Sequence, residues 1–153
     1  FLYYCRDAVG VGVDISTEAL KIAEENGQNL KITDRVEWRQ GDYLKAFDEE
    51  DIFDGIFSNP PYIPTKDIGG LPGEVKHEPR VALDGGTDGL YFYHLLAKGA
   101  AEHLKPGGFL AVEFGIGQAT DILEMFRKSA QYEDFEVIKD YGGIERALYC
   151  RKK

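Results

Sequence analysis

The feature that constrains this chain most is an apolar run ending in two consecutive prolines, Asp54-Gly55-Ile56-Phe57-Ser58-Asn59-Pro60-Pro61-Tyr62. Its first part, with Ile52 and Phe53 before it, has the length and composition of a buried strand. Each proline lacks a backbone N–H, fixes its own φ and holds the preceding residue in an extended conformation. The strand must therefore end here, with Asn59 at its carboxyl end, where open α/β sheets bind ligands.

Asn59 and Pro60 offer two carbonyl oxygens that suit one kind of ligand. The side-chain oxygen of Asn59 and the backbone oxygen of Pro60 together match both hydrogens of a planar –NH2 group. The ring of Tyr62 can lie against a flat substrate group and exclude water. A strand followed by a proline-rich turn with no binding role is an equally good interpretation of these residues alone.

The length of 153 residues predicts one domain with a single core, over residues 1–153. A hydrophobic content of 43% is ordinary for a soluble globular protein, and no apolar run is long enough to span a membrane. The net charge of −9 disfavours tight binding to nucleic acid, which depends on clustered Lys and Arg. Composition therefore favours a protein or small-molecule substrate.

The two cysteines, Cys5 and Cys150, lie near opposite ends of the chain without the close spacing of a metal site. We expect both to be reduced residues that pack against their neighbours. His77 has no His or Cys close by, which favours a structural role over metal binding or catalysis, and no metal site is predicted. No export signal is visible, which by default favours the cytoplasm.

Strand and helix patterns alternate along the chain. The predicted strands are Val9–Val13, Val36–Arg39, Ile52–Ser58, Phe109–Phe114, Phe135–Lys139 and Arg146–Cys150, and the predicted helices are Thr17–Asn26, Gly89–Leu104 and Gln118–Ala130. The first helix is expected to begin with Ser16 or Thr17 as its cap and to stop at Gly27. The alternation predicts a largely parallel sheet covered by helices, and the last two strands are expected to form an antiparallel hairpin.

Two aspartates directly follow predicted strands. Asp14 stands at the tip of the first strand, where a doubly wound fold places a carboxylate that binds ribose hydroxyls. Helix capping is about as good an interpretation of Asp14. Asp42 follows the second strand and can accept a hydrogen bond from an exocyclic amine of a nucleobase, with a solvated turn as the alternative.

A long segment rich in proline and glycine runs from Ile63 to Asp88. Structureless segments of this length in compact domains usually serve a function. Because the segment follows Tyr62 directly, we expect it to fold over the site as a lid or a substrate platform.

These motifs, in this order, resemble the class I S-adenosylmethionine-dependent methyltransferases and, more narrowly, the HemK/PrmC family. The narrower resemblance rests on Val11–Ser16 (VGVDIS), Ser58–Ile63 (SNPPYI), Leu71–Gly89 (LPGEVKHEPRVALDGGTDG) and Pro106-Gly107-Gly108. It implies a Rossmann-like α/β fold, a mostly parallel sheet with a C-terminal antiparallel hairpin, and S-adenosylmethionine as cofactor. The implied substrate is the side-chain amide nitrogen of a glutamine in a peptide-chain release factor.

The resemblance also implies the roles of eight residues. Cofactor contacts fall on Asp14, Ile15, Asp42, Tyr43 and Asn59, catalysis on Asn59 and Pro60, and substrate binding on Asn59, Pro60, Pro61 and Tyr62. Methyl transfer requires the nitrogen to be held in line with the methyl carbon, at roughly 3–3.5 Å. Two carbonyl groups that accept the amide hydrogens would stabilise the charge that develops on that nitrogen, with no general base or metal.

One part of the family's pattern is absent. The family carries an acidic residue and a glycine-rich loop at the first strand of the domain, and a separate N-terminal substrate-recognition domain. Phe1–Asp7 resembles the end of the helix that follows that loop, so the sequence is expected to be a partial catalytic domain. The strands Val9–Val13 and Ile52–Ser58 are then expected to lack the neighbour they would share.

Two other functions remain open at this point. Adenine-N6 methyltransferases of DNA or RNA use a similar Asn-Pro-Pro-Tyr to bind an exocyclic amine, although the acidic charge and the Leu71–Gly89 segment favour a protein substrate. The other alternative is a non-catalytic fragment that only binds a partner.

Overall fold

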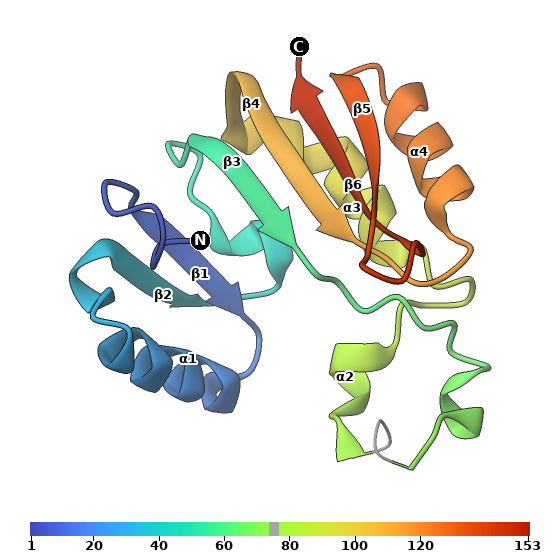
Figure 1. The fold of residues 1–153 in the computed structure, drawn as a ribbon, viewed down its shortest axis with the longest axis horizontal. Helices are drawn as coiled ribbons and strands as arrows, with labels where there is room; N and C mark the ends of the chain where they lie inside the picture. Colours follow the sequence, from blue (N-terminus) through green and yellow to red (C-terminus); the bar gives the residue numbers. More distant parts are fainter. Residues whose placement is uncertain (74–76) are drawn as a thin grey trace. The chain divides into compact units, whose positions relative to one another are not determined.

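The computed structural model describes residues 1–73 and 77–153, and the chain forms two compact units, Phe1–Asp48 and Glu49–Lys153 (Figure 1). Each unit contains a sheet of its own. The intervening residues 74–76 belong to the predicted segment Leu71–Gly89 and lie outside the described residues. The expectation of one domain over residues 1–153 stays a prediction.

The first unit is a parallel strand pair with one helix beside it. Its elements are β1 (Gly10–Asp14), α1 (Thr17–Asn29), a 3-10 turn at Thr33–Arg35, β2 (Val36–Gln40) and a second 3-10 turn at Tyr43–Ala46. β1 and β2 pair in register from Gly10 opposite Val36 to Asp14 opposite Gln40. Both strands therefore end at the same edge, as expected for a strand, helix and strand in succession.

Trp38 of β2 packs between two glycines. A Cβ atom on Gly12 of β1 would lie 2.3 Å from the indole ring, so only glycine allows the ring to lie against the strand. Gly27 of α1 faces the same ring, 3.7 Å from where its Cβ would be. The prediction that α1 stops at Gly27 is therefore wrong, because this glycine makes a close contact inside the helix.

The predicted cap of α1 is confirmed, since the Ala19 N–H donates to the Ser16 hydroxyl at 3.2 Å.

The start of the chain is held by Arg35. Its guanidinium group donates hydrogen bonds to the carbonyl oxygens of Leu2, Cys5 and Ala8, at 3.0, 3.1 and 3.0 Å. Residues 1–7 form turns, and the side chain of Cys5 is exposed. The expectation that Cys5 is a packing residue is therefore wrong.

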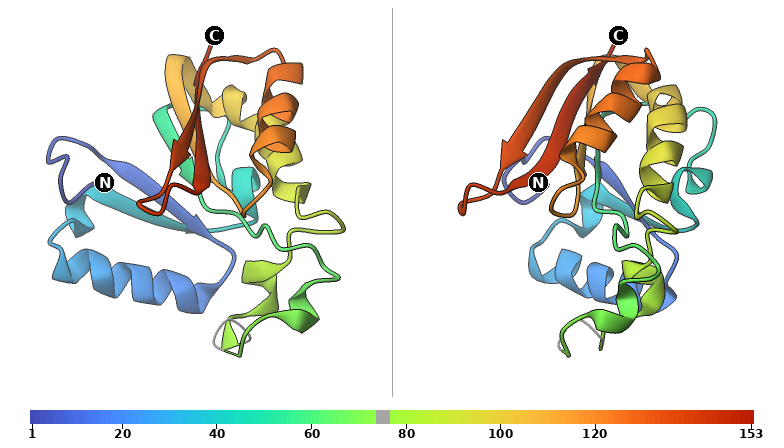
Figure 2. Two further views of the ribbon diagram at one scale, coloured as in Figure 1. Left: turned by 45° about the vertical axis from the view of Figure 1, so that its right-hand side comes forward. Right: turned by 90° about the vertical axis from the view of Figure 1, so that its right-hand side faces the viewer.

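The second unit is a four-stranded sheet with α3 and α4 on one face (Figures 1 and 2). Its elements are β3 (Phe53–Ser58), a 3-10 turn at Ile68–Gly70, α2 (Arg80–Leu83), α3 (Tyr91–Gly99), a 3-10 turn at Ala100–His103, β4 (Leu104–Glu113), α4 (Ala119–Lys128), β5 (Tyr132–Lys139) and β6 (Glu145–Lys152). The strand order is β3-β4-β6-β5, with β3 and β4 parallel and the other pairs antiparallel. The predicted C-terminal hairpin is confirmed.

The core of this unit lies between the sheet and the helices α3 and α4. Alternate residues of β4 and β6 enter it, together with one face of each helix: Tyr93, Leu96, Leu110, Val112, Phe114, Ile122, Phe126, Leu148 and Cys150. Burial raises the pKa of the Cys150 thiol to about 12, so this cysteine stays a neutral packing group. The expectation for Cys150 is confirmed.

β4 is longer than predicted because it includes Pro106-Gly107-Gly108. Its pairing with β3 jumps from Phe53 opposite Leu104 to Gly55 opposite Phe109. β4 accommodates the extra residues at Gly107, whose φ of +76° suits glycine. The helix predicted over Gly89–Leu104 ends correspondingly early, at Gly99, with a 3-10 turn after it.

The hairpin turn between β5 and β6 is organised by one carboxylate. Asp140 accepts hydrogen bonds from the backbone N–H groups of Ile144 and Gly142, at 3.0 and 2.8 Å, and from the Arg146 guanidinium at 3.3 Å. These bonds, led by that from Ile144, lower the pKa of Asp140. The turn at Tyr141-Gly142-Gly143 is therefore held in one conformation.

β3 lies at the edge of its sheet, and β1 lies in the other sheet. Within the described ranges, no strand pairs with the second edge of β3. The two strands that sequence analysis expected to share a neighbour are thus not paired with each other.

We predict that Gly55→Ala destabilises the protein by about 1–3 kcal/mol, the typical cost of overpacking. An added Cβ would lie 2.3–2.8 Å from ring atoms of Phe109. That ring stacks on Tyr149 and meets Phe57 edge-on, so it cannot move away without losing those contacts. Thermal melting measures the effect. Gly69→Ala, where nothing lies within 4 Å, is the matched control, and equal melting of the two variants would contradict the prediction.

Candidate functional site

Asn59 lies at a pocket at the carboxyl ends of β3 and β4. The pocket has a volume of about 310 Å³ and is lined by Phe57, Ser58, Asn59, Ala111, Val112, Glu113 and Ala147. The Asn59 side chain is exposed, whereas Pro60 is fully buried and Pro61 and Tyr62 are half-buried. The sheet thus presents an accessible amide group on a firmly packed turn, at the strand end where the sequence predicted it.

The chain after Asn59 is packed against two glycines of the segment that follows. A Cβ on Gly85 would lie 2.8 Å from the Pro61 carbonyl oxygen and 2.9 Å from the Tyr62 Cα. Gly89 has a φ of +78°, and a Cβ there would lie 2.4 Å from the Tyr62 carbonyl oxygen. Any side chain at either position would displace the Pro61-Tyr62 backbone.

Gln118 makes a further contact with this turn that sequence reasoning missed. Its side-chain nitrogen donates to the carbonyl oxygens of Tyr62, at 3.0 Å, and Gly89, at 3.3 Å. Its side-chain oxygen accepts the Gly115 N–H at 2.9 Å. In the sequence, the only sign of this contact is a polar residue between the end of β4 and the start of α4.

The segment from Ile63 to Asp88 is tied together at its base. Ile63 and Asp84 form a parallel bridge, with the Ile63 N–H bonded to Leu83 O at 3.0 Å and the Gly85 N–H bonded to Ile63 O at 2.9 Å. In its described part, the segment contains the 3-10 turn and α2. The expectation of a structureless segment is therefore wrong, because these backbone bonds close it. Its role as a lid or platform stays a prediction.

Asp84 reinforces this closure. Its carboxylate accepts hydrogen bonds from the Thr65 hydroxyl at 2.6 Å, the Gly86 N–H at 3.1 Å and the Arg80 guanidinium at 3.3 Å. The Thr65 bond, followed by the Gly86 bond, lowers the pKa of Asp84. The charged form of this side chain therefore joins both ends of the segment.

In the first unit, Asp14 and Ile15 lie at the carboxyl end of β1. One Asp14 carboxylate oxygen accepts the Ser16 N–H at 2.8 Å, and the Asp14 carbonyl accepts the Gly41 N–H at 3.1 Å. The Gln40 side chain donates to Ile15 O at 3.3 Å. Ser16, and not Asp14, is the helix cap. These bonds bring the ends of β1 and β2 together.

Asp42 and Tyr43 follow the end of β2 and complete this group. Asp42 precedes the 3-10 turn and forms an ion pair with Lys45 at 2.5 Å. Tyr43 has a φ of +59°, an uncommon backbone conformation for a residue with a side chain. A ligand that hydrogen-bonds Asp42 would therefore share it with Lys45.

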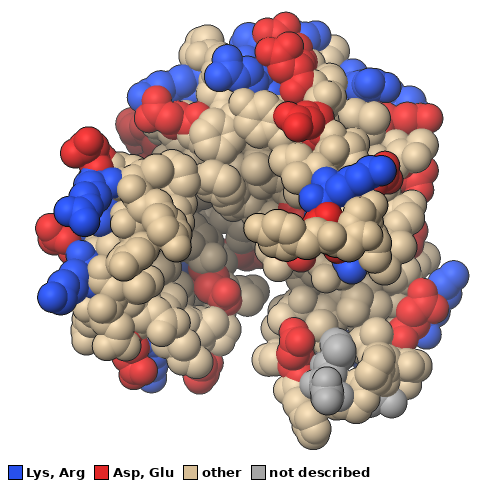
Figure 3. All heavy atoms as spheres, viewed as in Figure 1, with Lys and Arg blue, Asp and Glu red and all other residues tan. Residues whose placement is uncertain are grey.

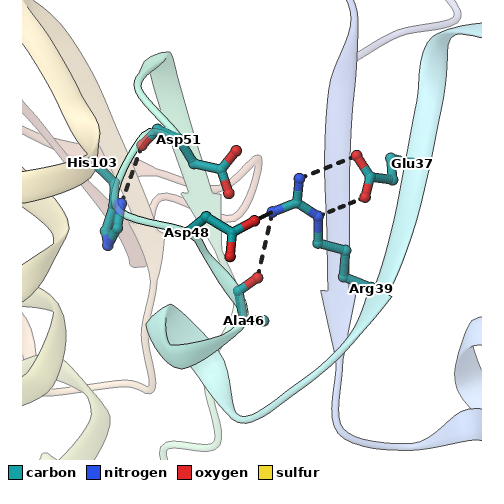
Figure 4. A network of polar contacts seen from close by, with 6 residues as sticks. All are labelled: Glu37, Arg39, Ala46, Asp48, Asp51 and His103. Atoms are coloured by element: carbon teal, nitrogen blue, oxygen red, sulfur yellow. Dashed lines mark hydrogen bonds and ion pairs between the residues drawn. The ribbon is translucent and has the colours of Figure 1, made fainter.

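Arg39 holds the 3-10 turn against β2 (Figure 4). Its guanidinium group binds the Glu37 carboxylate at 2.7 and 3.1 Å, the Ala46 carbonyl at 3.5 Å and the Asp48 carboxylate at 3.8 Å. The figure also shows a contact in the second unit, where the His103 ring nitrogen Nδ1 lies 3.1 Å from the Asp51 carbonyl oxygen. Arg39 thus fixes the turn that carries Asp42 and Tyr43.

The described residues contain neither a metal-binding cluster nor a membrane-spanning helix. Across ranges 1–73 and 77–153, no three or more His, Cys, Asp and Glu side chains are grouped so that they could hold a metal ion. No helix in those ranges has the length and apolar character needed to cross a membrane.

Comparison with known proteins shows that this chain is similar to methyltransferases. A family model for an RMKL-like methyltransferase domain matches residues 4–66. A methyltransferase from Pyrococcus furiosus has a similar structure, with a TM-score of 0.66 and 24% identity, over 93% of this chain and 61% of that chain. An RNA methyltransferase from Salinibacter ruber, solved with S-adenosyl-L-homocysteine, has a TM-score of 0.52 and 18% identity, over 95% and 66%. The predicted class I methyltransferase fold is confirmed.

Sequence comparison points to a narrower family within the methyltransferases. The chain is 40% identical to the release factor glutamine methyltransferase of Moorella thermoacetica, over 99% of this chain and 53% of the relative. It is 44% identical to the protein of that name from Caulobacter vibrioides, over 92% and 48%. The predicted resemblance to the HemK/PrmC family is thereby confirmed, and the chain spans about half the length of these curated relatives.

The structure therefore brings the predicted residues into two groups, one in each unit. The first comprises Asp14, Ile15, Asp42 and Tyr43, and the second comprises Asn59, Pro60, Pro61 and Tyr62. Their roles in cofactor binding, substrate binding and catalysis stay predictions.

We predict that the melting temperature of the Asp84→Asn variant falls less than that of the wild type as the pH is lowered from 6 to 3. A carboxyl group whose pKa is lowered on folding stabilises the protein above its unfolded pKa of about 3.9, and this stabilisation is lost as pH falls through the folded pKa. The wild type should melt higher than the variant at pH 6, and the difference should shrink toward pH 3. Asp67→Asn, at an exposed carboxylate of the same segment, is the control. A melting difference that is constant with pH would contradict the assignment.

Proposed function

We propose that the protein carrying this chain is an S-adenosylmethionine-dependent methyltransferase that modifies a glutamine side-chain amide in a peptide-chain release factor. The observation that carries the proposal is the exposed Asn59 amide, held at a pocket by the buried Pro60 and the packed Tyr62. The names of the relatives support both the reaction and the substrate. Because translation takes place in the cytoplasm, that compartment stays the predicted location.

The residues of the first unit fit the cofactor. A carboxylate has about four acceptor sites, so Asp14 can bind ribose hydroxyls in addition to the Ser16 N–H. Ile15, after the end of β1, is 51% exposed and offers an apolar surface, and Asp42, after the end of β2, can accept a bond from the adenine amine. S-adenosylmethionine, when bound, supplies a methyl group on a positively charged sulfur.

Asn59 and Pro60 would act on the substrate nitrogen. An amide nitrogen is a poor nucleophile because its lone pair is delocalised into the carbonyl group. Methyl transfer would form a bond from this nitrogen to the methyl carbon as the bond from that carbon to the positively charged sulfur breaks, so the nitrogen would become more positive and would then release one proton to water. Carbonyl oxygens of Asn59 and Pro60 that accept its two hydrogens would stabilise that charge. Among the described residues, no hydrogen bond of the Asn59 side chain competes with this role.

The closest alternative is a methyltransferase of an exocyclic amine in DNA or RNA, since such an amine also presents two hydrogens in one plane. The charge of the protein argues against a nucleic-acid substrate. On the face shown in Figure 3, the Lys and Arg side chains of the described residues lie among Asp and Glu and form no continuous basic area. The net charge of −9 adds to this argument, because nucleic-acid binding depends on clustered positive charge.

We predict that label from S-adenosylmethionine is transferred to release factor and not to DNA or tRNA. Because the chain spans about half its relatives' length, the assay uses the chain alone and a chimera. In the chimera, this chain replaces the matching part of the Moorella thermoacetica relative. The chimera should label a glutamine side chain, located by mass spectrometry, and the chain alone should label it more weakly. Label in nucleic acid alone would refute the proposed substrate, and no label from the chimera would favour a non-catalytic fragment.

We predict that Asn59→Ala in the chimera lowers kcat on the order of 100- to 1000-fold, the usual loss for one such electrostatic contact. Affinity for S-adenosylmethionine should change little, because the amide is proposed to act on the substrate. Asp14→Ala should do the reverse and weaken cofactor binding first. Steady-state kinetics and calorimetric titration separate the two effects. A kcat within a few-fold of the unsubstituted chimera would show that the role assigned to Asn59 is wrong.

A further inference from the structure

We propose that Gln118 is a positioning residue, which fixes the turn that carries Asn59 and Pro60 through the carbonyl group of Tyr62. The inference rests on the proposed function, since the groups it positions are those proposed to bind the substrate amide. Gln118 is half-buried and is separated from Tyr62 by 56 positions in the chain.

The three hydrogen bonds of the Gln118 side chain can form in only one orientation of its amide group. The side-chain oxygen faces a donor, the Gly115 N–H, and the side-chain nitrogen faces two acceptors, the carbonyls of Tyr62 and Gly89. Exchanging oxygen and nitrogen would place an oxygen against two carbonyl oxygens and an NH2 group against an N–H. The arrangement therefore requires an amide and not merely a side chain of this size.

These three partners belong to three separate parts of the second unit. Tyr62 follows the end of β3, Gly89 precedes α3, and Gly115 follows the end of β4. One side chain thus joins the turn after β3, the end of the Ile63–Asp88 segment and the turn that leads into α4. Gly89 adds to this junction, because the absence of a side chain there lets the backbone approach the Tyr62 carbonyl.

The turn needs such support because its own backbone provides little. The pairing of β3 with β4 ends at Ser58 opposite Val112. Pro60 and Pro61 have no N–H groups, so they cannot continue the ladder. The next backbone bond along the chain is the one from the Ile63 N–H to Leu83 O. Between these two attachments, the bond from Gln118 to Tyr62 O supplies a hydrogen-bonded anchor from outside the turn.

A loss of this anchor should affect chemistry more than binding of the cofactor. Amide methylation requires the two carbonyl oxygens to be placed accurately, and a displacement of about 1 Å can cost on the order of 100-fold in rate. The hydrogen-bond partners of the Gln118 side chain, Gly115, Tyr62 and Gly89, all belong to the second unit, whereas the proposed cofactor residues Asp14, Ile15, Asp42 and Tyr43 belong to the first. We therefore expect kcat to fall on the order of 10- to 100-fold, with the KM for S-adenosylmethionine changed by less than about threefold.

The decisive variants are Gln118→Ala and Gln118→Glu in the chimera. Glutamate keeps the shape and the acceptor for the Gly115 N–H but loses both donors and turns an oxygen toward two carbonyls. Protonation restores one donor, so the activity of the Gln118→Glu variant relative to the unsubstituted chimera should rise as pH falls. Gln131→Ala is the matched control, because Gln131 also donates to a backbone carbonyl, that of Lys98 at 3.2 Å, away from the Asn59 turn.

Hydrogen exchange followed by mass spectrometry tests the anchor without any need for activity. In Gln118→Ala, exchange should become faster in the peptides that contain Tyr62, Ile63 and Gly115, and it should not change there in Gln131→Ala. This measurement separates failure of the anchor from failure of the proposed function, in which the unsubstituted chimera would transfer no label. Unchanged exchange in these peptides would overturn the inference. It would also be overturned by a kcat equal to that of the control, or by no pH-dependent recovery in Gln118→Glu.

Discussion

The candidate site depends on the absence of backbone N–H groups at Pro60 and Pro61. Without these donors, β3 cannot extend its pairing with β4 beyond Ser58, and the chain must leave the sheet. Burial of Pro60 then fixes where it leaves, and the Asn59 side chain stays exposed at the pocket beside it. A rigid strand end with an accessible amide is thus the direct result of two residues that cannot donate hydrogen bonds.

Support for this strand end comes from elements that follow much later in the chain. Gly85 and Gly89 allow backbone to approach backbone, Gln118 supplies hydrogen bonds, and Asp84 closes the segment between them. Together these contacts hold the turn beyond Ser58, where the prolines cannot continue the strand pairing. Because polar groups held in this way need not reorganise when a substrate binds, such an arrangement suits electrostatic stabilisation of a developing charge.

In the first unit, the carboxylates of Asp14 and Asp42 lie at adjacent strand ends. Parallel pairing of β1 with β2 brings Asp14 and Asp42 to the same edge, and the Gly41 N–H bond to Asp14 O joins the two ends. Lys45 forms an ion pair with Asp42, and Arg39 holds the 3-10 turn that follows Asp42 through the Ala46 carbonyl.

The sequence by itself determined the order of the strands, although not the early start of β4, together with the hairpin, the cap at Ser16 and the position of Asn59 at a strand end. These features follow from local patterns, since apolar periodicity, capping residues and prolines act on their immediate neighbours. Only the tertiary structure decided that Gly27 lies inside α1 against Trp38, and that Cys5 is exposed while Cys150 is buried. It also decided that Gln118 reaches Tyr62 across 56 positions. Such contacts join residues far apart in the chain, and their distances depend on how whole elements pack, which no local pattern encodes.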